Sequence, residues 1–174
     1  EPLGEANCIM SLGNIRLQKG DNRGADSLFN AAISIFKQAG ESLGEANCIL
    51  ELGNIRFRVG DNRGADSLFN AALLIFQQVR EPLGEANCIL AQGKIAVRKE
   101  LLDVAHQKFI QALELFQSID HNYSIGRAYM QLAQISQRRS ERDQYIKLRL
   151  EHLEKGGAAH LIPRVLKLFP DYEQ

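Results

Sequence analysis

The sequence lacks the features that mark a protein for nucleic acid, a membrane or secretion. Its 21 basic and 21 acidic side chains leave no net charge, which excludes the strongly basic surface of a general nucleic-acid binder. No apolar run approaches the roughly 18 residues of a membrane-spanning helix. The first residues contain neither the basic nor the apolar segment of a secretory signal peptide. We therefore expect a cytoplasmic protein with no nucleic-acid partner and no membrane partner.

Motifs that carry catalysis or hold a cofactor are missing as well. There is no Gly-x-Ser-x-Gly, Walker A or His-Glu-x-x-His pattern, and the four histidines follow no metal-ligand spacing. The glycine-rich segment 20–24 has no Lys-Ser or Lys-Thr pair, so it is better interpreted as a turn than as a phosphate-binding loop. We expect no catalytic residue, no metal and no cofactor in this chain, and we predict that it is not an enzyme.

What the sequence does contain is a forty-residue internal repeat. The segment Leu-Gly-Glu-Ala-Asn-Cys-Ile begins at residues 3, 43 and 83, and the first two copies are identical at 29 of 40 positions. A third copy keeps the apolar skeleton, and a fourth, weaker copy begins near residue 121. The predicted array therefore spans 1–155, with repeats at about 1–40, 41–80, 81–120 and 121–155. A fixed period of this length predicts a repeat architecture.

Each copy has the apolar period of two helices. Apolar side chains recur at three- and four-residue steps on both sides of a short polar segment. Gly20 stands where a left-handed residue would end the first helix, and Asp21 or Asn22 can cap the second. Each unit is therefore predicted to be a helix–turn–helix hairpin.

The small and aromatic positions of these hairpins resemble the tetratricopeptide repeat. Gly13, Ala25, Phe29 and Ala32 have the spacing of that signature. The same positions recur in copy two as Gly53, Ala65, Phe69 and Ala72, and in copy three as Gly93, Ala105, Phe109 and Ala112. The resemblance implies an all-α fold, a right-handed α-solenoid of about four hairpins, whose first helices line a concave groove that binds other proteins.

The sequence departs from that family in two ways. Arg16, Arg56 and Ala96 stand where the family has a bulky aromatic residue, and the period is forty rather than about thirty-four. The longer period is similar to arrays in GoLoco-containing spindle-orientation adaptors and to sensor arrays of NACHT-type NTPases. Two functions follow from the resemblance: a non-enzymatic scaffold that binds a peptide segment of a partner, or a regulatory or oligomerising arm of a larger signalling NTPase.

The two ends of the array differ. Gly156 and Gly157 end a polar helix predicted over 141–155, and a last amphipathic helix is expected to start near Ile162, because Pro163 fits only in a first turn. We interpret residues 156–174 as a capping helix and tail. The N-terminal end begins directly on a repeat. We therefore expect the C-terminal part of a longer protein, with weak self-association through the uncapped end, where Leu3 and Ile9 would be exposed.

Polar side chains form a stripe on one face of the first helices, at the spacing that residues of one helical face share. Asparagine both donates and accepts hydrogen bonds, which suits contact with a peptide backbone. A merely solvated face accounts for part of this pattern. Several members of the stripe are cationic, so we favour an acidic peptide. The candidate peptide-binding residues are Asn7, Asn14, Asn47, Asn54, Arg58, Asn87, Lys94, Arg98, Arg127, Gln134 and Arg138.

The three cysteines occupy one position of the repeat, as Cys8, Cys48 and Cys88. Neighbouring helices pack about 8–10 Å apart, which is too far for a disulfide between residues at the same position of successive repeats. We therefore predict that all three are small apolar residues packed between hairpins.

Overall fold

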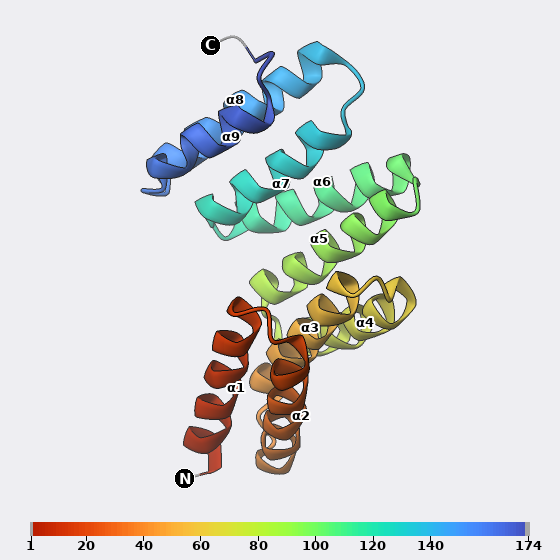
Figure 1. The fold of residues 1–174 in the computed structure, drawn as a ribbon, viewed down its shortest axis with the longest axis vertical. Coiled ribbons are helices and arrows are strands. Elements are labelled where there is room, and N and C mark those ends of the chain that lie inside the picture. The colour runs from red at the N-terminus through yellow and green to blue at the C-terminus, as the bar shows by residue number, and fades with distance from the viewer. Residues whose placement is uncertain (1, 173–174) are drawn as a thin grey trace. The chain divides into compact units, whose positions relative to one another are not determined.

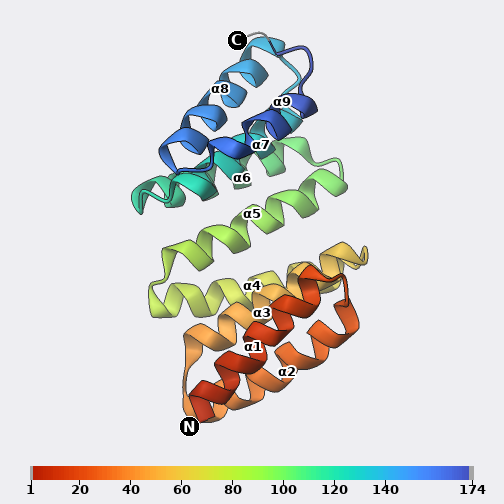
Figure 2. The same cartoon turned by 60° about the vertical axis from the view of Figure 1, so that its left-hand side comes forward.

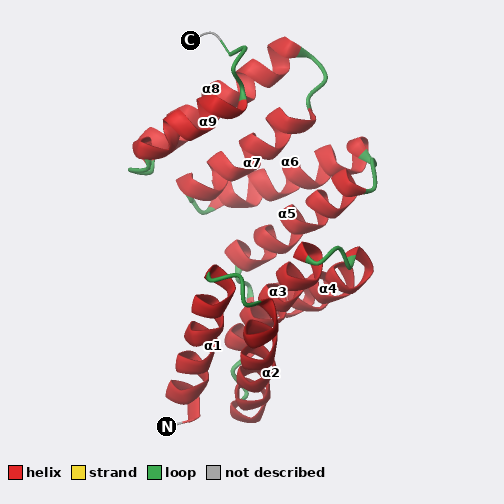
Figure 3. Cartoon of the chain, in the orientation of Figure 1, coloured by secondary structure: helices red, strands yellow, loops and turns green. Residues whose placement is uncertain are grey.

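The computed structural model describes residues 2–172, and in that range the helices follow one another in hairpins (Figures 1 and 3). In chain order they are α1 (Pro2–Gln18), α2 (Asn22–Ala39), α3 (Ser42–Arg58), α4 (Asn62–Val79), α5 (Pro82–Arg98), α6 (Leu102–Ser118), α7 (Asn122–Ile135), α8 (Arg139–Lys155), the 3-10 helix η1 (Ala159–Leu161) and α9 (Ile162–Leu168). No helix in this range combines the length and apolar composition needed to cross a bilayer. The predicted all-α repeat of helical hairpins is confirmed.

The turn inside the first hairpin forms as the sequence predicts. Gly20 has a φ of 78°, in the left-handed region that glycine adopts readily. Asp21 is the N-cap of α2, and its Oδ1 accepts a hydrogen bond from the backbone N–H of Gly24 at 2.9 Å. In the third copy Glu100 takes the left-handed conformation with a φ of 59°, and Leu101 makes no side-chain cap. The turns of copies one and two therefore have an N-cap hydrogen bond to an aspartate side chain, which the turn of copy three lacks.

Glycine and phenylalanine bring the two helices of a hairpin together. A Cβ placed on Gly13 would lie 2.8 Å from Cε1 of Phe29, and one on Gly53 would lie 2.5 Å from Cε1 of Phe69. Only glycine leaves room for the ring at these positions. The alanine and phenylalanine positions of the second helices are fully buried in the first three copies: Ala25, Phe29, Ala32, Ala65, Phe69, Ala72, Ala105, Phe109 and Ala112. The glycine, alanine and phenylalanine positions of the repeat thus form the contact between the two helices of each of these hairpins.

A second set of contacts joins one hairpin to the next. The ring of Phe36 lies over Gly44, where a Cβ would be 2.5 Å from Cε1, so the end of α2 packs closely against the start of α3. The Glu41 side chain caps α3 by accepting a hydrogen bond from the backbone N–H of Gly44 at 2.5 Å. Phe76 and Gly84 repeat the ring contact. Close contact with a phenylalanine ring thus requires glycine near both ends of α3 and of α5.

The chain forms two compact units that divide within α5, between Ala91 and Gln92. In unit 1, α1 packs on α2, α2 on α3 and α3 on α4 (Figure 2). In unit 2, α6 packs on α7 and α7 on α8, and the ring of Phe109 lies against Gly93. Each unit therefore has a core of its own.

The C-terminal segment agrees with the sequence pattern in most respects. Helix α8 begins at Arg139, two residues before the predicted start, and α9 begins at Ile162 with Pro163 in its first turn, as predicted. Helix α9 packs on α8 (Figure 1). Asn122 Oδ1 and His152 Nδ1 lie 2.9 Å apart and join the start of α7 to the last turn of α8. That this segment caps an array stays a prediction.

Candidate peptide-binding site

In unit 1 the predicted stripe lies along the first helices. Asn7 is exposed on α1 and Asn14 is half-buried. On α3 both Asn47 and Asn54 are half-buried, and Asn54 Nδ2 donates a hydrogen bond to Glu51 Oε2 at 3.2 Å. The polar atoms of this face are therefore partly held in place by one another, and Glu51 belongs to the face.

Two further candidates of unit 1 differ in exposure. Asn87 is half-buried on α5, whereas Arg58 is exposed at the last position of α3.

Arg56, which stands where the family has an aromatic residue, forms an ion pair with Asp26 of α2, with Nη2 to Oδ1 at 3.0 Å. An ion pair between α2 and α3 thus occupies the place of the aromatic contact.

In unit 2 the stripe brings two cations together. Lys94 is half-buried on α5, and Arg127 is half-buried on α7. Burial, and secondarily the charge of Arg127, lowers the pKa of Lys94 from 10.5 to about 8. The ammonium group is therefore half-buried and near a second cation, an environment that an added anion would stabilise.

The remaining candidates at the ends of these helices are exposed. Arg98 is the last residue of α5, and Gln134 lies on α7. Gln131 Nε2 donates a hydrogen bond to Gln134 Oε1 at 3.3 Å. These side chains can reach a ligand, but neither is buried enough to dominate its binding.

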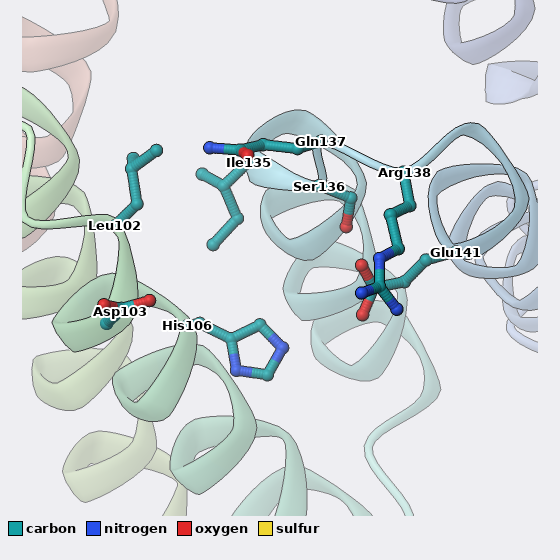
Figure 4. Close-up of a pocket in the computed structure, with 8 residues that line it drawn as sticks. All are labelled: Leu102, Asp103, His106, Ile135, Ser136, Gln137, Arg138 and Glu141. Atoms are coloured by element: carbon teal, nitrogen blue, oxygen red, sulfur yellow. The ribbon is translucent and has the colours of Figure 1, made fainter.

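The predicted position of Arg138 is wrong. The stripe places it on the first helix of copy four, but α7 ends at Ile135, because Ser136 turns to an extended conformation and its hydroxyl donates to the carbonyl of Leu132 at 2.8 Å. Arg138 instead lies on the connection to α8, where it lines a cavity of about 320 Å³ with His106 (Figure 4). It is therefore not equivalent to Arg58 and Arg98.

The cysteines differ along the chain. Cys48 and Cys88 are buried, and burial raises the pKa of each thiol to about 12, so both stay protonated. The packing role predicted for them is confirmed. The same prediction is wrong for Cys8, which is exposed on α1, where no helix covers it. Within residues 2–172, His, Cys, Asp and Glu side chains form no group of three that could hold a metal ion.

One charged residue was missed as a candidate. Arg149 is only 7% exposed, although the sequence pattern places it on a polar helix. It is the eleventh residue of α8, and the eleventh residue of each earlier second helix is a fully buried alanine: Ala32, Ala72 and Ala112. Counted from the observed helix starts, a cation therefore replaces alanine inside the fourth hairpin.

Comparison with known proteins shows the fold. The aspartyl phosphate phosphatase F of Bacillus subtilis has a TM-score of 0.84 at 12% identity, over 95% of this chain and 44% of that one. The apo form of RapI has a TM-score of 0.76 at 16% identity, over 93% and 60%. The Rap conjugation gene regulator of plasmid pLS20, solved with the Phr* peptide, has a TM-score of 0.81 at 18% identity, over 100% and 48%.

These similarities show the fold, an array of helical hairpins, and this chain spans 44–60% of the three structures' lengths. No family model and no curated protein sequence matches the chain. None of the three structures is named as a GoLoco adaptor or a NACHT-type NTPase, so neither subtype gains support.

Proposed function

We propose that this chain is a non-enzymatic protein-interaction module that binds an acidic peptide segment of a partner on its first helices. The observation that carries the proposal is the half-buried pair Lys94 and Arg127 in unit 2. Both side chains project from first helices, the elements that carry the polar stripe. The neighbour solved with the Phr* peptide supports peptide binding as a use of this fold.

The physical reason is that burial and the nearby charge of Arg127 both disfavour the charged form of Lys94, so an added anion would stabilise it. A carboxylate from a peptide would pair with the charged lysine and accept hydrogen bonds from both side chains. Gln134, in the same unit, has an amide side chain that supplies both donors and acceptors for peptide backbone. The cations would therefore select the partner, and the amide would add a contact that tolerates many sequences.

The first prediction concerns peptide selection. A displayed library of random peptides, selected on the wild-type chain, should become enriched in Asp and Glu. Calorimetry with a selected peptide should show binding about tenfold weaker for the double variant Lys94→Met/Arg127→Met, because charge-assisted hydrogen bonds are lost. Circular dichroism should show the same helical content.

The matched control is Arg63→Met/Lys147→Met, which removes the same charge from exposed positions outside the stripe. It should bind the selected peptide like the wild type. Equal weakening in both double variants would show that net charge alone governs binding. Selected peptides without acidic enrichment and with unchanged affinity for the Lys94→Met/Arg127→Met variant would refute the proposal.

We also propose weak self-association through α1. Leu12 and Ile15 are each 45% exposed, whereas the equivalent Leu52 and Ile55 are 5% and 3% exposed beneath the preceding hairpin. Leu3 is exposed as predicted, but Leu43 is exposed to the same extent, so Leu3 does not distinguish the end. The predicted exposure of Ile9 is wrong, because Ile9 is half-buried and packs against the core of unit 1. The apolar face of α1 therefore has the chemistry of a helix–helix contact without its neighbour.

In sedimentation velocity experiments, the sedimentation coefficient of the wild type should rise with protein concentration. A Leu12→Gln/Ile15→Gln variant should stay monomeric, because the substitutions make two apolar contact positions polar. Leu74→Gln, at an exposed site on α4, is the control and should behave like the wild type. A wild-type coefficient that does not change with concentration would exclude association by this face.

A further inference from the structure

The fourth hairpin contains a pair of residues that the other hairpins do not have. Arg149 occupies the buried alanine position of the second helix. The fifth residue of the first helix is a fully buried alanine in copies one to three, at Ala6, Ala46 and Ala86, but it is Gly126 in α7. A Cβ placed on Gly126 would overlap Nη1 of Arg149. The glycine therefore makes room for the guanidinium against α7.

The guanidinium is buried without a balancing charge. Its Nη1 donates one long hydrogen bond, 3.4 Å, to the carbonyl of Tyr123, and its Nε has no partner among the described residues. Within residues 2–172, no carboxylate lies at ion-pair distance from it, and Arg127 is the nearby charge. Burial lowers its pKa. An arginine has five N–H donors, so this side chain keeps unused hydrogen-bonding capacity.

Arg149 also lines a cavity of about 200 Å³ between α7, α8 and α9. A second cation, Arg164 of α9, lies on its wall, and Leu161, Val165 and Leu168 give it an apolar side. Two arginines beside aliphatic side chains fit a ligand that carries one carboxylate next to a branched aliphatic group. The volume limits that ligand to about the size of one amino-acid residue.

We propose that this cavity is a binding site for a small aliphatic carboxylate, with Arg149 as its main anion-binding residue. The ligand is either a free branched-chain acid or the C-terminal carboxylate of a peptide that ends in an aliphatic residue. The cavity shares no lining residue with the acidic-peptide face proposed above, and the proposal does not depend on that face.

The test uses N-acetyl-leucine as the probe, with binding followed by chemical shifts in the full chain. Resonances of Val165, Leu168 and the Arg149 side chain should shift in a saturable way. The neutral N-acetyl-leucinamide should bind about tenfold or more weakly, because it lacks the charge that pairs with arginine. If 4-methylpentanoate binds like N-acetyl-leucine, a free acid is the source; if only N-acetyl-leucine binds, a peptide terminus is the source.

Two variants keep the test independent of folding. Arg149→Met keeps the length of the side chain and removes its charge. Gly126→Ala/Arg149→Ala restores the alanine pair of the first three hairpins, so at least this variant should fold. Both should lose N-acetyl-leucine binding, whereas Arg63→Met should retain it. Binding that persists in both variants, or equal binding of the acid and the amide, or no binding by the wild type, would overturn the proposal.

Discussion

Replacing Gly126 by alanine should lower the free energy of unfolding by about 1–3 kcal/mol, the range of overpacking in a buried contact. Alanine is the better helix former by about 1 kcal/mol, so an isolated helix would respond in the opposite direction. The difference arises because the new Cβ overlaps Nη1 of Arg149 and lies 3.1 Å from its Cδ. Urea unfolding monitored by circular dichroism gives the value.

A double-mutant cycle identifies the cause. Arg149→Ala should relieve most of the loss caused by Gly126→Ala, since the pair then matches Ala46 and Ala72 of the second hairpin. Gly4→Ala is the control, because nothing lies within 4 Å of a Cβ there. It should raise stability slightly, as helix propensity predicts. If Gly126→Ala is as stable as the wild type, Arg149 does not pack against α7 in solution.

Lys94→Met should raise the free energy of unfolding by about 2 kcal/mol at neutral pH. In the folded chain the pKa of Lys94 is about 8, against 10.5 for the ordinary group. At neutral pH the lysine is thus charged in both the folded and the unfolded chain. The cost of burying its charge therefore lowers the free energy of unfolding. Methionine fills a similar volume and removes that penalty.

The pH dependence follows from the same shift. Between pH 8 and pH 10.5 the unfolded chain holds the Lys94 proton more tightly than the folded chain, so wild-type stability should rise with pH across this window. The difference in stability between wild type and Lys94→Met should therefore shrink as the pH rises, while the difference for Lys147→Met, an exposed control, stays constant. A constant difference for Lys94→Met would mean that the lysine is well hydrated.

The features that the sequence predicts correctly depend on residues close together in the chain or on positions that recur from copy to copy. The turn at Gly20 and Asp21 depends on residues a few positions apart, and the Gly13–Phe29 contact recurs in three copies, so the spacing alone identifies both. The end of α7 is different, because Ser136 stops the helix through its own backbone and hydroxyl bonds. No periodicity of apolar residues predicts such a stop, and this is why Arg138 was placed on the wrong element.

The buried position of Arg149 is not apparent from the sequence, because the second helix of copy four is shifted relative to the repeat period. The first helices of copies two and four align at an offset of 80 residues, from Ser42 to Asn122, but the second helices align at 77, from Asn62 to Arg139. The shorter α7 and its connection to α8 account for the difference. An alignment with one offset therefore sets Arg149 against Phe69, and the true alignment, with Ala72, requires the observed start of α8.

The exposure of Cys8 gives the protein an intrinsic chemical reporter. Of its three thiols, those of Cys48 and Cys88 are buried and protonated, so a maleimide dye should modify Cys8 first. Cys8 lies one and two turns before Leu12 and Ile15, on the same face of α1. The rate of labelling would therefore measure directly how often that face is covered by another molecule, without any substitution in the chain.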